Sequence, residues 1–464
     1  MRQSAESDSV RHLLRRFGLG ATATEVAFYG KDGYRQAVDM LISTANVAEP
    51  FDDDISKFAG NNGIIQARSL QTRWLMTMVG TRRPLAHAMA LFWHDHFATS
   101  AMKVDRPLMM NAQIELLQNR GLGPFPELLR AMSKDPAMLY WLDNHENRKG
   151  KPNENFAREV MELFTLGIGH YSEMDIQEAA RAFTGWTFRS RGNGRSVDQI
   201  NLTTFVNRLA DHDTGSKTML GSTGDFNGDD VLDLLCRQAR TAYYLTEKVW
   251  EWFAYPQPDP KLIERIAADW QKKGLVVADL VRLVANAPEF TSKKAKRAIV
   301  KNPVHFCVST LRQVGAGRQV IQALESEETT PRRLAVGAVA SVSTKAMGME
   351  LLYPPDVAGW EGGASWISSA TMVERIRWAE RLFGRQNQLA AQALLALFAG
   401  KTDPDGFVRH TMALFDAELP GSKLPSLVDA VKASAPNGLT TANIRPTLLQ
   451  VTKLLFGSPE FQFC

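Results

Sequence analysis

Apolar side chains recur at three- and four-residue steps through most of this chain, with polar residues between them. The clearest example covers residues 65–98, where the repeating positions are Leu70, Trp74, Met78, Leu85, Met89, Phe92 and His96. Such steps place side chains on one face of an α-helix. Pro84 suits the first turn of a helix, where no backbone N–H is needed, so we expect a helix to begin there.

The period changes in two places. Residues 186–221 contain a turn at Gly192 and Gly194, followed by short runs around Thr203 and Phe205 that are typical of strands or extended loops. A second stretch, YPPDVAGWEGGASW, is rich in glycine and tryptophan. We therefore predict a mainly α, multi-helical globular protein with a small β/loop insertion around 186–221 and a Gly/Trp-rich loop around 353–366.

The length of the chain bears on its domain organisation. It has 464 residues, more than the roughly 100 to 200 residues of one ordinary domain. We expect an N-terminal helical lobe over residues 1–190, an extended or β-rich insertion over 191–228 and a C-terminal helical lobe over 229–464. One continuous domain is the alternative.

Charge and cysteine content argue against several classes of protein. The 54 basic and 50 acidic residues are interspersed and leave a net charge of +4. The densest basic stretch, residues 293–301, has no aromatic side chains that could stack on bases, so nucleic acid is not the expected partner. The cysteines are too far apart to indicate a disulfide framework or a thiolate zinc site; they are Cys236, Cys307 and Cys464.

Membrane and export signals are missing from the sequence as written. No apolar run approaches the roughly 18 residues that span a bilayer, so we expect no transmembrane segment. The first residues, MRQSAESDSV, lack the apolar core of an export signal. The sequence therefore predicts a cytoplasmic protein, or an exported one if a leader was removed.

Carboxylates and glycines are most concentrated in the segment NENFAREVMELFTLGIGHYSEMDIQEAARAFTGWTF. The apolar spacing predicts a helix over residues 156–166 that ends at Gly167, where glycine suits a left-handed turn. On its polar side Glu159 and Glu162 are three residues apart and project together, with Arg158 beside them. Glu159 and Glu162 are thus candidate catalytic residues, and Arg158 is a candidate substrate-binding residue.

A second helix is predicted to follow a tight turn. The hydroxyl of Ser172 and the carboxylate of Asp175 match a capping box, which marks the start of this helix. His170 and Tyr171 then fall in a glycine-controlled turn between two helices, where their side chains could be directed into a cleft. His170 is the third candidate catalytic residue, and Tyr171 is a candidate substrate-binding residue.

The same cluster has a purely structural interpretation. Arg158 and Glu162 are four residues apart and can form an ordinary helical ion pair, and Glu178 with Arg181 can form another; each contributes roughly a few tenths of a kcal/mol. Ion-pair networks perturb titration without doing chemistry. The segment therefore predicts either a site or a brace between two helices.

Histidines are concentrated in the segment FWHDHF. On a helix His94 and His96 diverge by about 200°, so they face one ion only if the helix ends between them. One hypothesis is a divalent metal held by His94 or His96 together with Glu159 or Glu162. Core histidines satisfied by hydrogen bonds are the other. Neither HExxH nor a Glu-X-X-His spacing supports the metal.

Two loops offer further ligand-binding side chains. His212 and Lys217 belong to the loop HDTGSK, where the lysine could bind an anion, although turn formation explains the same residues. Trp186 and Trp360 each follow a glycine, and their flat rings could contact a sugar or an aromatic ligand. Ordinary burial is the alternative for both rings. All four residues are candidate substrate-binding residues.

Several stretches together resemble one large bacterial family. They are HLLRRFG at 12–18, FWHDHFATS at 92–100, DPAMLYWLD at 135–143, the segment around Glu159 and Glu162, HDTGSKTMLG at 212–221 and PPDVAGW at 354–360. On these motifs the chain resembles the family catalogued as domain of unknown function 1800, over nearly its whole length. The resemblance implies no particular activity and no catalytic residue.

The resemblance does imply a context. Members of the family often carry export signals, and they are frequently encoded beside a second family that resembles alkaline-phosphatase-type enzymes. A protein of that second family is therefore a candidate partner. This sequence departs from the exported pattern, because it starts almost at its first motif.

Two functions stay open. The favoured hypothesis is an enzyme whose His/Glu cleft uses general acid/base or metal-assisted chemistry on a polar small molecule or glycan, including phosphate-containing substrates. The alternative is a non-enzymatic helical scaffold, or a module that binds a glycan or a protein. Motifs of common serine hydrolases, P-loop enzymes and dinucleotide-binding enzymes are missing. Convergence of the candidate histidines and glutamates on one pocket would favour the enzyme.

Overall fold

The computed structural model describes residues 2–326, 334–384, 398 and 403–464. Helices account for most of these residues, and the described strands form two small antiparallel sheets. The predicted mainly α class is therefore confirmed. Within the described part of the chain, no helix is both long enough and apolar enough to cross a membrane.

Helices alternate with short connections along the whole described chain. The first half contains α1 (Arg2–Phe17), α2 (Ala23–Tyr29), α3 (Tyr34–Ser43), α4 (Ala67–Gly80), α5 (Pro84–His96), α6 (Ala101–Val104), α7 (Pro107–Arg120), α8 (Phe125–Ser133), α9 (Pro136–Trp141), α10 (Asn155–Glu162) and α11 (Glu173–Ala182). The second half contains α12 (Gly228–Arg237), α13 (Ala239–Phe253), α14 (Pro260–Lys272), α15 (Val277–Asn286), α16 (Pro303–Gln313), α17 (Ala316–Glu325), α18 (Ala335–Ala346), α19 (Ser369–Phe383), α21 (Pro404–Leu414), α22 (Leu424–Ser434) and α23 (Ile444–Gly457).

The described strands form two hairpins, as the change of period in this region predicts. The pairs are β1 (Trp186–Ser190) with β2 (Thr203–Asn207), and β3 (Lys217–Met219) with β4 (Ser222–Gly224). Gly185 separates α11 from β1 with a φ of +83°, a conformation that favours glycine. The predicted Gly/Trp-rich loop contains one 3-10 turn, Gly363–Trp366, among irregular backbone.

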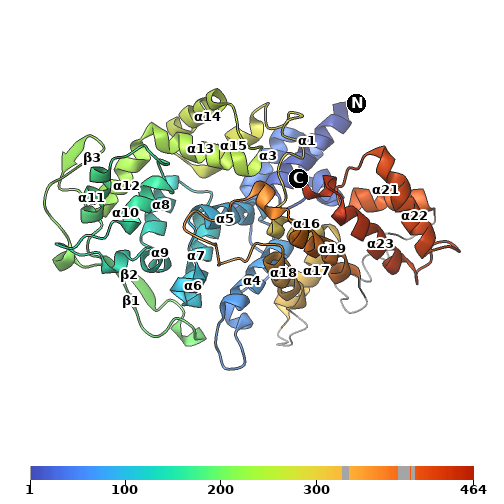
Figure 1. The fold of residues 1–464 in the computed structure, drawn as a ribbon, viewed down its shortest axis with the longest axis horizontal. Coiled ribbons are helices and arrows are strands. Elements are labelled where there is room, and N and C mark those ends of the chain that lie inside the picture. Colours follow the sequence, from blue (N-terminus) through green and yellow to red (C-terminus); the bar gives the residue numbers. More distant parts are fainter. Residues whose placement is uncertain (1, 327–333, 385–397, 399–402) are drawn as a thin grey trace.

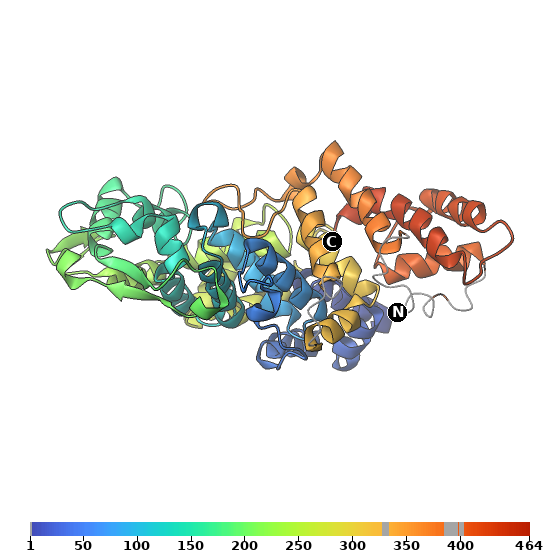
Figure 2. The same cartoon turned by 90° about the horizontal axis from the view of Figure 1, so that it is seen from below.

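The molecule is elongated (Figures 1 and 2). The β hairpins and α11 lie at one end, α21 to α23 lie at the other, and α4, α5, α7 and α16 lie between them (Figure 1). Buried hydrophobic residues nevertheless form one connected cluster from Val10 to Phe461. This hydrophobic core crosses the predicted boundaries at residues 190 and 229. The division of the chain into two lobes and an insertion stays a prediction.

Long-range polar contacts join the first helix to the last third of the chain. Arg15 in α1 donates to both carboxylate oxygens of Asp416, at 2.6 and 3.1 Å, and both side chains are buried. The ring of His12 shares a hydrogen bond of 3.0 Å with the carbonyl of Phe290. These contacts fix α1 against segments nearly 300 to 400 positions later in the sequence.

Helix α5 lies near the centre of the molecule (Figure 1). Every residue of this helix is buried except Asp95, and the helix packs against α1, α3 and α7. A helix that is apolar on all sides must be surrounded by other elements. Pro84 occupies its first turn, as predicted. Because the helix continues through His96, the side chains of His94 and His96 diverge, and the condition for their facing one ion is not met.

Helix α10 ends at Glu162, before the predicted end at Leu166. The N–H of Phe164 then donates to the carbonyl of Glu159 at 3.1 Å, an i to i−5 bond that widens the last turn. The irregular turn leaves the carbonyl of Phe164 free to bind the ring of His96, 68 positions earlier in the chain. The predicted end of the helix was wrong because a tertiary contact decides it.

Candidate functional site

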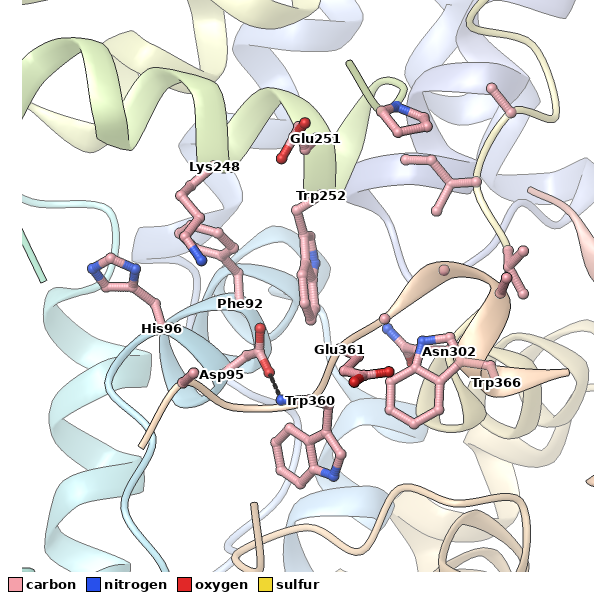
Figure 3. Close-up of a pocket in the computed structure, with 18 residues that line it drawn as sticks. Phe92, Asp95, His96, Lys248, Glu251, Trp252, Asn302, Trp360, Glu361 and Trp366 are labelled. Carbon is pink, nitrogen blue, oxygen red and sulfur yellow. Dashed lines mark hydrogen bonds between the residues drawn. The ribbon is translucent and has the colours of Figure 1, made fainter. Parts of the chain in front are cut away.

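A cavity of about 410 Å³ opens at the C-terminal end of α5. Its walls come from the last turn of α5, the end of α13, residues 298–302 and the Gly/Trp-rich loop (Figure 3). The charged side chains in these walls are Asp95, Lys248, Glu251 and Glu361, and the aromatic ones are Phe92, Trp252, Trp360 and Trp366. A cavity of this size, with aromatic walls and a few polar groups, is typical of a small-molecule site.

His94 and Asp95 fasten the Gly/Trp-rich loop to α5. Nε2 of His94 accepts a hydrogen bond from the backbone N–H of Leu352 at 3.1 Å. Oδ1 of Asp95 accepts one from the backbone N–H of Trp360 at 2.8 Å (Figure 3). Gly359 permits this close approach, because its φ is +87° and a Cβ atom there would lie 2.5 Å from Oδ1 of Asp95. The motifs FWHDHFATS and PPDVAGW therefore meet at one wall of the cavity.

The carboxyl group of Asp95 titrates close to neutral pH. Burial raises its pKa from 3.8 to about 6, although the Trp360 N–H and the charge of Lys248 act in the opposite direction. Asp95 also lies in the last turn of α5, where the negative end of the helix dipole disfavours a second negative charge. Asp95 can therefore both hold and release a proton near pH 7.

His96 lines the cavity, and one nitrogen of its ring has no partner and is closed to water. His96 is 5% exposed, and its Nε2 lies 3.2 Å from the carbonyl oxygen of Phe164. A carbonyl only accepts, so Nε2 must carry the proton and Nδ1 must be a lone-pair acceptor. Nδ1 has no hydrogen-bond partner within the described chain. Burial, reinforced by Lys248, lowers the pKa of His96 to about 3, which keeps the ring neutral.

Helix α13 contributes the opposite wall. Its core face holds residues such as Leu245, Val249 and Phe253. Lys248 and Trp252, one turn apart, lie along one edge of this face and project toward the cavity (Figure 3). The described residues provide Lys248 with no hydrogen-bond or ion-pair partner. Its ammonium group lies 5.8 Å from the ring centre of Tyr244, next to the cavity. A cation in this position is free to meet a ligand.

The remaining wall combines a helix start with the end of the loop. Asn302 caps α16 by accepting a hydrogen bond from the N–H of His305 at 2.8 Å, which leaves its side-chain N–H groups available to the cavity. Glu361 is exposed at the rim between Trp360 and Trp366 (Figure 3). The carboxylate of Glu361 has no partner among the residues that the structure describes. This side of the cavity is thus acidic and aromatic.

The candidate catalytic residues Glu159, Glu162 and His170 do not line this cavity. Glu162 accepts a hydrogen bond from the hydroxyl of Tyr171. Burial and the charge of Glu162 raise the pKa of Glu159. His170 is exposed in the turn. The residues whose convergence would favour an enzyme are His94, His96, Glu159, Glu162 and His170. Only His96 lines this cavity, so the enzyme hypothesis loses its main support from the sequence.

Arg158 makes different ion pairs from the one that the sequence suggests. Its guanidinium lies 3.3 Å from Glu154 and 2.8 Å from Glu173, rather than pairing with Glu162. The contact with Glu173 joins α10 to the first turn of α11. Glu178 and Arg181 do form the expected pair, at 2.9 Å. Of these contacts, only the Arg158–Glu173 pair links two helices, because Glu178 and Arg181 both belong to α11.

Three other candidate substrate-binding residues have structural partners. Trp186 is 2% exposed and packs in the core between Phe183 and Phe205. The ring of His212 forms a hydrogen bond of 2.9 Å with the carbonyl of Thr184. The buried ammonium of Lys217 donates to the carbonyls of Asp213 and Gly215 at 2.7 and 2.9 Å. Turn formation accounts for Lys217, and of the proposed ligand-binding residues Trp360 lines the cavity.

The metal hypothesis gains no support from the geometry. Within the described ranges, no three His, Cys, Asp or Glu side chains are grouped in a way that could hold a metal ion. Nε2 of His94 is occupied by the N–H of Leu352, and burial lowers the pKa of His94 to about 4. His94 therefore acts as a neutral acceptor that holds the loop.

Sequence reasoning missed most of the cavity wall, namely Asp95, Lys248, Glu251, Trp252, Asn302 and Glu361. The sequence of α13 carried no clear signal for Lys248 or Trp252. Trp252 lies seven residues after the buried Leu245, so the spacing places it at the edge of the core stripe.

The fold and the cavity define a class: a mainly α-helical protein with an acidic, tryptophan-lined cavity at the end of a central buried helix. The family model described as "Protein of unknown function (DUF1800)" matches residues 12–463. The chain belongs to this family. Comparison with curated proteins finds no match, and comparison with solved structures finds none either.

Proposed function

We propose that the cavity at the end of α5 is the active site of an enzyme that binds a carbohydrate and transfers a proton through Asp95. One observation carries this proposal: Asp95, whose carboxyl group has a raised pKa, lines a cavity together with His96 and three tryptophans. Nδ1 of His96 has no partner among the described residues and is closed to water. Buried polar groups almost always have partners, so a ligand that reaches this ring would satisfy the acceptor.

The two side chains suit different roles. With a pKa of about 6, Asp95 is protonated in about one molecule in ten at pH 7, so both of its forms are populated. His96, with a pKa of about 3, is a weak base and stays neutral. Proton transfer is most effective when the pKa of the group is near the working pH. We therefore assign proton transfer to Asp95 and positioning of a ligand hydroxyl to His96.

A carbohydrate fits the rest of the wall. Trp252 is half-buried in the cavity wall, and the mostly buried rings of Trp360 and Trp366 also line it. Hydroxyl groups can both donate and accept hydrogen bonds, so they suit His96 and Lys248 alike. A ligand with apolar faces and a hydroxylated edge satisfies both kinds of surface. This proposal keeps the acid/base enzyme predicted from the sequence and moves its centre from Glu159 and Glu162 to Asp95.

Binding and turnover can be tested together. Neutral, acidic and amino oligosaccharides are titrated into the protein while tryptophan fluorescence is followed, and incubated mixtures are analysed by mass spectrometry for altered glycans. The expected result is quenching by at least one glycan class and a product that depends on Asp95. A scaffold alone predicts neither, and a glycan-binding module predicts quenching without a product.

Two variants and two matched controls make the test specific. Asp95→Asn keeps the acceptor for Trp360 and is expected to abolish turnover while the fold is retained. His96→Ala is expected to weaken binding about tenfold or more, because a hydrogen bond to a buried acceptor is lost. The controls Asp259→Asn and His170→Ala alter exposed side chains outside the cavity. Equal behaviour of variants and controls would refute the assignment.

A further inference from the structure

Negative charge outnumbers positive charge in the cavity wall. Asp95, Glu251 and Glu361 supply carboxylates, whereas Lys248 supplies the single ammonium group of the lining. Asp356 adds a further negative charge that acts on Asp95. In a space with restricted water, this imbalance attracts a cationic ligand.

Hydrogen-bonding capacity in the wall is biased in the same direction. Nδ1 of His96 is a nine-tenths buried acceptor without a partner. Oδ1 of Asp95 accepts the N–H of Trp360, which leaves Oδ2 for the cavity. The carboxylate of Glu361 has no partner among the described residues. The donors are the ammonium of Lys248 and the side-chain amide of Asn302. Acceptors therefore dominate, and a ligand rich in N–H and O–H donors would satisfy them.

The aromatic side chains favour a cation in one part of the cavity. Trp360 and Trp366 flank Glu361, and Trp252 faces them across the cavity (Figure 3). Tryptophan faces attract cations more strongly than those of other aromatic residues. Lys248 lies on the other side, with His96 (Figure 3). An ammonium group is thus best placed beside Glu361, away from the lysine.

We propose that the carbohydrate bound in this cavity carries a free primary amine, held as an ammonium group between Glu361 and the tryptophan rings. The hydroxyl groups of the same sugar chain then reach His96, Asp95 and Lys248. The inference rests on the proposed function, because it specifies the ligand of the same site. An N-acetylated or neutral sugar would leave the Glu361 carboxylate without a counter-charge.

The test compares three glycans that differ only in the group at one position of the ring. A tetrasaccharide of glucosamine, its fully N-acetylated form and a tetrasaccharide of glucose are titrated into the full chain at one ionic strength, with tryptophan fluorescence as the signal. The glucosamine form is expected to bind about tenfold or more tightly than the other two. Added salt is expected to reduce this advantage, since part of it is electrostatic.

A charge-neutralising variant assigns the effect to one residue. Glu361→Gln is expected to remove most of the advantage of the glucosamine chain and to leave binding of the glucose chain unchanged. Glu127→Gln, an exposed carboxylate on α8 outside the cavity, is the matched control and should change neither. Glu361 is exposed at the rim, so its replacement is compatible with folding, which a thermal melt verifies.

The outcomes separate this inference from the proposed function. Equal affinity for the three chains, or an advantage that survives in Glu361→Gln, would overturn the amine and leave the carbohydrate site intact. No binding of any of the three chains, combined with no quenching by any other glycan class, would refute the proposed function and the inference with it. Tighter binding of the amine form, lost in Glu361→Gln, supports the amine and the carbohydrate site, and the product that depends on Asp95 then tests the enzyme.

Discussion

Replacing Asp95 by asparagine should stabilise the protein at neutral pH. The substitution keeps the size of the side chain and the oxygen that accepts the N–H of Trp360. It removes a carboxyl group whose pKa burial raises from 3.8 to about 6. That difference corresponds to about 3 kcal/mol at about 1.36 kcal/mol for each tenfold change in proton affinity. The ionised carboxylate therefore costs the folded wild type up to this amount.

The sign and the pH window follow from the two pKa values. A carboxyl group whose pKa is raised by folding binds its proton more tightly in the folded state. Below pH 3.8 the group is protonated in both states, so its ionisation contributes no difference between wild type and Asp95→Asn. The advantage of the variant should grow between pH 3.8 and about 6 and stay constant above about 6.

Equilibrium unfolding in urea, followed by circular dichroism at several pH values, measures this profile. Asp259→Asn is the control, because Asp259 is an exposed cap that accepts the N–H of Lys261 at 3.0 Å. Both variants are compared with wild type at the same pH values. A pH-independent difference for Asp95→Asn, or a variant less stable than wild type at pH 8, would show that the Asp95 carboxylate is not destabilised by its surroundings.

Three further predictions concern contacts around the site and in the core. In urea unfolding, Gly359→Ala should destabilise the protein by roughly 1–3 kcal/mol more than Gly363→Ala. Both glycines have positive φ, but only at Gly359 would the added Cβ lie 2.5 Å from Asp95. Equal losses of stability in the two variants would contradict this contact. Arg158→Ala should cost less than about 1 kcal/mol, since exposed ion pairs contribute little, and a larger loss in the same assay would show that the pair with Glu173 braces the helices strongly. Asp416→Asn should cost about 3–5 kcal/mol, because it leaves the buried Arg15 without its counter-charge; a thermal melt close to that of wild type would refute this.

Local features of the fold could be predicted from the sequence. The capping box of Ser172 and Asp175 is present in the structure, and Gly167 has the positive φ expected after a helix. Both depend on residues within one or two turns. The end of α10 could not be predicted, because the carbonyls after Glu162 are taken by distant side chains, among them the hydroxyl of Tyr244 bound to Leu163 at 3.2 Å.

The cavity could be predicted only in part, for a related reason. His96 and Trp360 were recognisable as unusual residues, but nothing in their spacing placed Lys248 and Asn302 next to them. Four separate segments form the wall, so their proximity is a result of packing around α5. The dense charges around Glu159 were easier to see in the sequence, although a dense run of charges is usually a solvated helix face.

The identity of residue 95 itself argues for a function. Holding the loop requires only an acceptor for the N–H of Trp360, and an asparagine would provide one without the cost of a buried negative charge. An ionisable group that destabilises the fold, placed beside the unpartnered nitrogen of His96, has no structural advantage over its neutral isostere. Strained or costly groups in natural proteins are concentrated at functional sites. The carboxylate of Asp95 is therefore better explained by the proton transfer proposed for it than by the contact it makes.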